Sequence, residues 1–307
     1  MSRKLVCLGP GGSYGDCVAQ WLNANVFHGT VEIEFVKDNQ DVLAEIENGS
    51  GEADLPMGIV PVYNTVEGYV AGVMRYLMRG PSHEKYYLST QPSFVSEETF
   101  HVVGKVTLRI RHQLFACDPS VQLSDIKTVV SHGQALGQCA RMLRRILPDA
   151  SLEPMSSTSG AAQSVAEIQD PSRAAIASRF CAGLYNLTPL VDDVADVKEN
   201  YTHFYLVVKG HRIVQNDFGS GVAVLLWPDR NEAGVLHDIL SPMAALKVNV
   251  RYAPQIPLGG ADNRVVFCIE MDVHKNPRVM NAIFTLLAAM SKRMIVLGSF
   301  LNEAIIE

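Results

Sequence analysis

The first 210 residues alternate short apolar strands with helical segments, and no other feature limits the possible folds as strongly. The run "KLVCLG" (4–9) ends in a Gly-Pro-Gly-Gly turn and predicts a strand, and "SYGDCVAQWLNAN" (13–25) predicts the helix that follows. "VEIEFV" (31–36) has the alternation of a strand, and the next helix is expected at 39–49, with Asn39 as its N-cap and Gly49 as its stop. Strands that alternate with helices tend to pair in parallel, so we expect a layered α/β fold.

The same alternation continues to residue 210. "MGIVPV" (57–62) and "GYVAGVMRYLMRG" (68–80) predict a strand and a helix, and the stretch 86–105 is rich in residues that favour strands. The rest of this part predicts a strand with one long helix (127–147), a helix (156–170), a strand with a helix (173–187) and a closing strand (202–210).

A second unit follows a polar stretch. The segment "KGHRIVQNDFGSG" (209–221) predicts a linker. Beyond it, the order strand, helix, strand, strand, helix, strand predicts a ferredoxin-like βαββαβ unit, in the segments 222–228, 234–246, 248–254, 264–273, 277–290 and 293–301. We therefore expect two units, 1–210 and 219–307.

Composition narrows the possible functions. Apolar residues make up 48% of the 307 and charged residues 19%, which favours a packed core over disorder. The net charge of −6 argues against nucleic acid as the main partner, and no apolar run approaches the ~18 residues of a membrane span. Six cysteines without a Cys-x-x-Cys pair are typical of reduced, buried thiols in a cytoplasmic protein. The nine histidines lack metal-ligand spacing, so we expect no metal site.

The first predicted strand ends in a glycine-rich turn, "LGPGGSYGD" (8–16). A dinucleotide site is not favoured, because Tyr14 stands where the spacing G-x-G-x-x-G requires glycine. Backbone N–H groups at the start of the helix, together with the Ser13 hydroxyl, instead predict an anion cradle. The alternative is a plain tight turn.

Polar side chains also gather at four other predicted strand or helix boundaries. Each set alone fits an Asx-turn, an N-cap or an ordinary strand residue. Because the carboxyl ends of parallel strands meet at one edge of a sheet, together they predict one cleft for a small substrate that carries carboxylates. No nucleophile–base pair is evident, so we expect catalysis by preorganised hydrogen bonds. The residues are Asn64 with Thr65, Ser131 with His132 and Gln138, the hydroxyls of 156–159, and Thr202.

These stretches, in order, resemble the motifs of the prephenate dehydratase family. Thr202-His203-Phe204 stands where the family has T-R-F, and the C-terminal unit is similar to the ACT regulatory domain appended to many of these enzymes. The other matching stretches are "LGPGGSYGD" (8–16), "PVYNTVEG" (61–68), "SHGQALGQC" (131–139), "STSGAA" (157–162), and "AAIAS" (174–178) followed by "YNL" (185–187).

The resemblance implies a fold and an activity. It implies two α/β lobes around a cleft, as in periplasmic binding proteins, with lobe 1 at about 1–80 plus 187–210 and lobe 2 at about 81–186, followed by an ACT domain at 219–307. It implies a lyase that turns prephenate, a dicarboxylate, into phenylpyruvate in L-phenylalanine biosynthesis, without a cofactor. Loss of the ring carboxylate expels the C4 hydroxyl, so the enzyme needs orientation and a hydrogen-bond donor for that hydroxyl. Homodimers or homotetramers through ACT domains are also implied.

The resemblance also assigns roles to residues. Thr202 is the donor to the departing hydroxyl, and Ser131 and Gln138 are further catalytic residues. The substrate-binding residues are Ser13, Tyr63, Asn64, Thr65, Ser157, Thr158, His203 and Phe204. In the ACT-like unit, Gly234, Val235 and Leu236 stand at the family's G-A-L effector motif.

Three positions depart from the family pattern. Tyr63 replaces the acidic residue of P-x-E-N, and His203 replaces the arginine of T-R-F. Unlike an arginine, a histidine need not be charged at neutral pH. The family's E-S-R-P effector loop becomes Pro-Gln-Ile-Pro at 254–257 and loses both charges. We therefore expect weak or absent feedback by phenylalanine.

Two other functions stay open on the sequence alone. The first is a non-aromatising prephenate decarboxylase, or an enzyme for an amino analogue of prephenate, because the changes at Tyr63 and His203 would suit altered proton delivery. The second is a ligand-binding regulator without catalysis, against which the retained Ser131, Gln138 and Thr202 argue.

Overall fold

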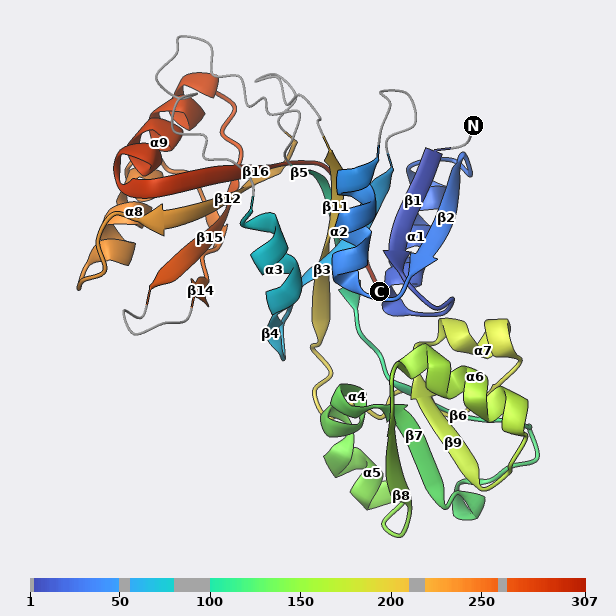
Figure 1. Ribbon diagram of the computed structural model, residues 1–307. Coiled ribbons are helices and arrows are strands. Elements are labelled where there is room, and N and C mark those ends of the chain that lie inside the picture. Colours follow the sequence, from blue (N-terminus) through green and yellow to red (C-terminus); the bar gives the residue numbers. More distant parts are fainter. Residues whose placement is uncertain (1–2, 50–55, 80–99, 210–218, 259–263) are drawn as a thin grey trace.

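The strands of the protein form two sheets. A computed structural model describes residues 3–49, 56–79, 100–209, 219–258 and 264–307 (Figure 1). In these ranges the larger sheet has 11 strands, in the order β13-β15-β12-β16-β5-β11-β3-β1-β2, with β14 paired to β15 and β4 to β3. The smaller sheet has 5 strands, in the order β10-β6-β9-β7-β8. The predicted α/β class is confirmed.

The first lobe is built on one half of the larger sheet. β1 (Arg3–Leu8), β2 (Val31–Val36) and β3 (Met57–Asn64) are parallel, and β11 (Tyr201–Lys209) pairs antiparallel with both β3 and β5 (Phe100–Arg109). The remaining elements are α1 (Tyr14–Asn25), α2 (Asn39–Asn48), β4 (Gly68–Tyr69) and α3 (Ala71–Leu77). Figure 1 shows α2 and α3 on one face of this half and α1 on the other.

The cap of α2 differs from the prediction by one residue. Asp38, not Asn39, has the extended backbone that an N-cap requires, and its Oδ1 accepts a hydrogen bond from the Gln40 N–H at 2.7 Å. Gly49 follows the helix as expected.

The second lobe surrounds the smaller sheet. Its strands are β6 (Gln113–Ala116), β7 (Thr128–His132), β8 (Ser151–Met155), β9 (Arg173–Ala177) and β10 (Thr188–Val191). Its helices are α4 (Gly133–Gln138), α5 (Ala140–Ile146), α6 (Thr158–Ile168) and α7 (Phe180–Tyr185), with a short 3₁₀ helix at Leu123–Asp125.

The prediction of one long helix after β7 is wrong, because the helix is broken at Cys139 between α4 and α5. The Asp196 carboxylate explains the break. It accepts hydrogen bonds from the backbone N–H groups of Arg141 and Met142, at 3.0 and 2.8 Å, and so satisfies the start of a second helix. A contact made by a residue 55 positions away cannot be read from local spacing.

The C-terminal unit has the expected βαββαβ order with one added short strand. It consists of β12 (Gly221–Pro228), α8 (Val235–Ala245), β13 (Val250–Tyr252), β14 (Gln255–Pro257), β15 (Val265–Asp272), α9 (Pro277–Ala289) and β16 (Ser291–Ile306). Pro277 occupies the first turn of α9, where its missing N–H costs nothing. Both helices pack on one face of the strands, around Phe267 and Phe284.

The two units share one sheet and one core. β16 pairs with β12 in its first half, and its second half pairs parallel with β5 of the first lobe (Figure 1). Buried side chains from both sides of this junction pack together, including Val60 and Tyr205 with Leu225 and Ile295. The C-terminal unit is therefore continuous with the strands of the first lobe.

Two strands lie on the other side of the lobe boundaries that we predicted. β5 falls within the range assigned to lobe 2 but pairs with β11 and β16 in the larger sheet. β10 falls within the range assigned to lobe 1 but pairs with β6 in the smaller sheet. Most of the predicted linker and the first part of the 86–105 segment lie outside the described residues.

Two further expectations concern the whole chain. All six cysteines are free and buried, which confirms the prediction of reduced thiols. Within the described ranges, no helix combines the length and the apolar character needed to cross a membrane.

Candidate active site

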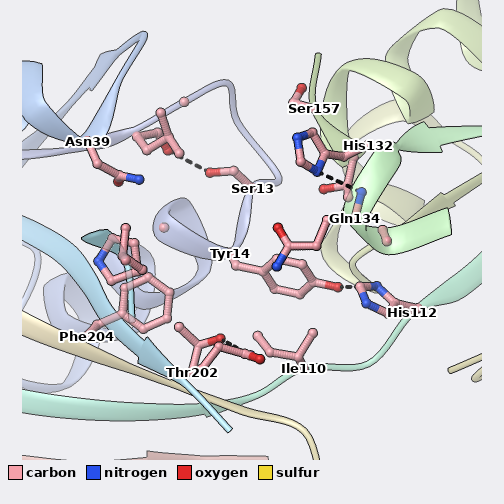
Figure 2. A pocket seen from close by; sticks show the side chains of 18 of the residues that line it. Ser13, Tyr14, Asn39, Ile110, His112, His132, Gln134, Ser157, Thr202 and Phe204 are labelled. Carbon is pink, nitrogen blue, oxygen red and sulfur yellow. Dashed lines mark hydrogen bonds between the residues drawn. The ribbon is translucent and has the colours of Figure 1, made fainter. Parts of the chain in front are cut away.

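A cavity of about 390 Å³ lies between the two lobes, and five of the motifs line it. The glycine-rich turn brings Ser13 and Tyr14, and the end of β3 brings Asn64. The other polar or titratable residues that line the cavity are Asn39, His112, His132, Gln134, Gln138, Ser156, Ser157, Thr158 and Thr202. Figure 2 shows Ser13, His132, Ser157 and Thr202 around this space. The predicted cleft at the strand ends is therefore present.

The ends of two helices lie at the cavity. At the first of them, two groups of the predicted anion cradle are already used within the protein: the Ser13 hydroxyl donates to the Leu8 carbonyl at 2.7 Å, and the Gly12 N–H donates to the Asp16 carboxylate at 2.8 Å. Ser13 and Ser157 are the N-caps of α1 and α6, and their hydroxyls accept the N–H groups of Asp16 and Gly160 at 3.1 and 2.9 Å. The positive ends of both helices therefore face this space. No lysine or arginine of the described residues lines it. The cavity suits carboxylates held by neutral donors and helix ends.

The Thr202 hydroxyl is held with its proton unused. Asn64 Nδ2 donates to Thr202 Oγ1 at 2.9 Å, so Oγ1 is the acceptor in that contact. Within the described part of the chain, the Thr202 O–H has no acceptor in hydrogen-bonding range. The side chain is 9% exposed at the cavity wall. A bound molecule is thus the partner to which this hydroxyl can donate.

Gln138 lies at the centre of a network that joins the lobes. Its Oε1 accepts from Asn200 Nδ2 at 3.1 Å and lies 2.8 Å from His112 Nε2, while its Nε2 donates to the Glu67 carboxylate at 2.8 Å. These contacts fix Nε2–H as the donor of the His112 ring. Burial lowers the pKa of His112, so the neutral ring is favoured.

The other nitrogen of His112 faces Tyr14. His112 Nδ1 lies 3.0 Å from the Tyr14 hydroxyl, and the two rings meet edge to face in Figure 2. Because His112 holds both Tyr14 and Gln138, it fixes two cavity side chains from different lobes. Glu67 lies within the stretch "PVYNTVEG" but received no role there, and no matching stretch contains His112 or Asn200. The sequence signal for these three residues is their position near the end of a strand or in a turn.

Four predicted site residues do not line the cavity. Ser131 is fully buried in the second lobe, where its hydroxyl donates to the Ile176 carbonyl at 2.6 Å and links β7 to β9. Thr65 Oγ1 accepts from the Tyr201 N–H at 2.9 Å and so joins the β3 turn to β11. Tyr63 and His203 point to the opposite face of their strands and stack on each other. The side-chain contacts of these four residues are structural.

Burial lowers the pKa of His203 to about 4, with a smaller contribution from the Lys105 ammonium. His203 is therefore neutral at neutral pH and does not supply the charge of the arginine that it replaces. Phe204, one residue further on, returns to the cavity face and forms part of its apolar wall.

Comparison with known proteins identifies the family. The family model described as prephenate dehydratase matches residues 5–212, which include every residue of the cavity. The chain belongs to the prephenate dehydratase family.

Curated relatives agree with this assignment, and a solved structure shares the fold. The chain is 25% identical over 275 residues to the prephenate dehydratase of Methanocaldococcus jannaschii, covering 90% of each chain. It is 27% identical over 305 residues to the bifunctional chorismate mutase/prephenate dehydratase of Escherichia coli strain K12, covering 99% of this chain and 72% of that one. The prephenate dehydratase of Arthrobacter aurescens, solved in complex with L-Phe, superposes with a TM-score of 0.75 at 24% identity, over 97% of this chain and 89% of that chain.

Proposed function

We propose that this protein is a prephenate dehydratase, a lyase that converts prephenate into phenylpyruvate, carbon dioxide and water in L-phenylalanine biosynthesis. Membership of the family supports this activity. The observation that carries it at the site is the Thr202 hydroxyl, which accepts from Asn64 and keeps its own proton for a molecule in the cavity.

The proposed chemistry uses orientation and hydrogen bonds. The helix ends at Ser13 and Ser157 hold the carboxylates of prephenate. When the ring carboxylate leaves as carbon dioxide, its electron pair stays in the ring and moves through the diene, and the bond from C4 to its oxygen breaks. Thr202 donates a hydrogen bond to that oxygen as its negative charge develops, and the oxygen leaves as water after taking up a proton. Gln138, held by His112, fixes the width of the cavity between the lobes.

We expect the purified protein to release phenylpyruvate from prephenate, with one carbon dioxide for each molecule of product. The product spectrum separates the candidate functions, because only the dehydratase gives an aromatic keto acid. Carbon dioxide with a retained diene would indicate the decarboxylase, and binding without turnover would indicate a regulator. The changes at Tyr63 and His203 are the features that would favour a decarboxylase. Neither of these side chains lines the cavity.

The proposal extends to the C-terminal unit. We propose that residues 219–307 form an ACT-like regulatory domain through which the protein forms homodimers or homotetramers. Gly234, at the first position of the G-A-L motif, has φ of 93°, a backbone conformation suited to glycine, and is the N-cap of α8. Val235 and Leu236 pack against the core of the unit.

We expect L-phenylalanine to bind weakly or not at all to this protein. The segment Pro254–Pro257, aligned with the family's effector loop, has no charged side chain to meet an amino-acid ammonium or carboxylate. Isothermal titration of the full chain with L-phenylalanine measures this directly. A dissociation constant of about 10 μM or below would show that other groups in the unit replace the lost charges.

A further inference from the structure

The two faces of β11 have different neighbours. Side chains alternate along a strand, so Thr202 and Phe204 face the cavity while His203 and Tyr205 face the opposite side. β3 behaves in the same way, with Asn64 on the cavity side and Tyr63 on the other. The residues next to the Asn64–Thr202 pair in sequence therefore point toward the C-terminal unit.

Tyr63 and His203 are direct partners across the two strands. Tyr63 pairs with His203 in the register, and the next pair is Asn64 with Thr202. The two rings are stacked, with centroids 5.9 Å apart and planes inclined by 11°. The family motifs have a glutamate and an arginine at these two positions, which in this register would form an ion pair across the strands. The two departures are thus one coordinated change, from an ion pair to a neutral ring pair.

The C-terminal unit packs directly on this ring pair. Tyr252 of β13 meets the Tyr63 ring edge to face, at 4.6 Å between centroids, and Tyr69 of β4 does so at 5.7 Å. On the far side, His203 Nδ1 lies 2.8 Å from the Thr107 hydroxyl. Two aromatic side chains, Tyr252 and Tyr69, and the Thr107 hydroxyl contact the pair, so its position depends on where β13 lies.

The same part of the C-terminal unit also contacts β11 directly. Tyr252 pairs across the strands with Glu270, whose carboxylate forms a buried ion pair with Lys105 of β5 and accepts a hydrogen bond from the Tyr205 hydroxyl. Tyr205 is two residues after His203 on the same face of β11. The C-terminal unit therefore contacts β3 through Tyr252 and Tyr63, and β11 through Glu270 and Tyr205.

We propose that Tyr63, His203 and Tyr252 are positioning residues through which the C-terminal unit sets the place of Asn64 and Thr202 in the cavity. This inference rests on the proposed function only in the role of Thr202 as the donor. A shift of the ring pair moves the next pair of the ladder, because Asn64 and Thr202 share its two strands. Small displacements of a reacting group change turnover more than they change binding.

The first test replaces Tyr252 in the full chain. Tyr252→Ala removes the ring, and we expect kcat for prephenate, per folded molecule, to fall about tenfold with KM within about twofold. Tyr252→Phe is the matched control. It keeps the ring that packs on Tyr63 and removes only the hydroxyl, so we expect kcat within about twofold of the wild type. The methyl resonance of Thr202 should shift in Tyr252→Ala and stay in place in Tyr252→Phe.

The second test restores the family's ion pair. Tyr63→Glu and His203→Arg each place one unpaired charge in the partly buried contact among Tyr63, His203 and Tyr252. We expect each substitution alone to lower kcat and the free energy of unfolding. The double variant, with both charges, should recover most of both losses, so the effects of the two substitutions should be strongly non-additive. The unfolding free energy gives this result without any substrate.

The outcomes separate this inference from the proposed function. If the wild type makes no phenylpyruvate, the proposed function fails. The Thr202 resonance and the non-additivity of the unfolding free energies still test whether Tyr63, His203 and Tyr252 position Thr202. If Tyr252→Ala leaves both kcat and the Thr202 resonance unchanged, the three residues do not position Thr202. Additive effects of Tyr63→Glu and His203→Arg would equally overturn the pairing.

Discussion

Replacing Thr202 by valine is expected to lower kcat for prephenate by at least about 100-fold, the usual range for loss of a positioned hydrogen-bond donor to developing charge. The free energy of unfolding should stay within about 1 kcal/mol of the wild-type value, as expected for one neutral hydrogen bond. Asn64 Nδ2 keeps the Asn200 side-chain oxygen at 2.7 Å and the Tyr201 carbonyl at 3.2 Å as acceptors, so no buried donor is left without a partner. Phenylpyruvate formation and chemical denaturation measure the two quantities.

Thr202→Ser is the matched control because it keeps the hydroxyl and removes only the methyl group. Its kcat should stay within about tenfold of the wild type, and KM should change little in either variant. If Thr202→Val retained more than about half of the wild-type kcat, the hydroxyl would not be the donor, and the donor would be sought among the titratable cavity residues Tyr14, His112 and His132.

Most of the residues predicted for the site line one cavity because they lie at or close to strand ends on the same edge of a sheet: Ser13 follows β1, Asn64 ends β3, and Thr202 lies at the start of antiparallel β11. Ser13, Asn64, Gln138 and Thr202 come from segments up to about 190 residues apart in the sequence, yet they line one cavity. The carboxyl ends of parallel strands necessarily meet, so a polar residue after each apolar run is informative about position. What each of these residues does in the reaction stays a prediction.

The sequence was less informative about which way a residue faces. Tyr63 and His203 are next to Asn64 and Thr202, so a motif includes them, but the alternation of a strand turns them to the other face. Ser131 also stands within a motif, and only the packing of β9 against β7 shows that its hydroxyl serves the Ile176 carbonyl. His112 and Asn200 reach Gln138 through contacts between distant segments, which no local pattern records.

The joining of the two units was also beyond local patterns. The apolar run from residue 293 predicted a strand, but its partner β5 lies about 200 residues earlier in the chain. Pairing over such a distance is decided by tertiary packing. The ferredoxin-like order was readable because it depends on short connections within one segment.

A buried ion pair lies at the junction between the first lobe and the C-terminal unit, and we expect substitutions that break it to lower the stability of the fold strongly. Lys105 and Glu270 have side chains that are 8% and 4% exposed, and they join β5 of the first lobe to β15 of the C-terminal unit. Lys105→Met removes the ammonium and leaves the Glu270 carboxylate buried with the Tyr205 hydroxyl as its remaining donor. We expect a loss of about 3–5 kcal/mol in the free energy of unfolding, the usual cost of breaking such a pair from one side.

The double variant Lys105→Met with Glu270→Gln tests the cause of that loss. It removes both charges and keeps an amide oxygen that can accept from Tyr205, so it should be more stable than Lys105→Met alone. Denaturant unfolding of the wild type, both single variants and the double variant gives the coupling energy. If the losses simply add, the cost comes from packing against neighbours such as Phe300, whose ring centroid lies 5.5 Å from the Lys105 ammonium, rather than from an uncompensated charge. Strong coupling would instead mean that electrostatics, together with strand pairing, holds the C-terminal unit against the strands of the active site.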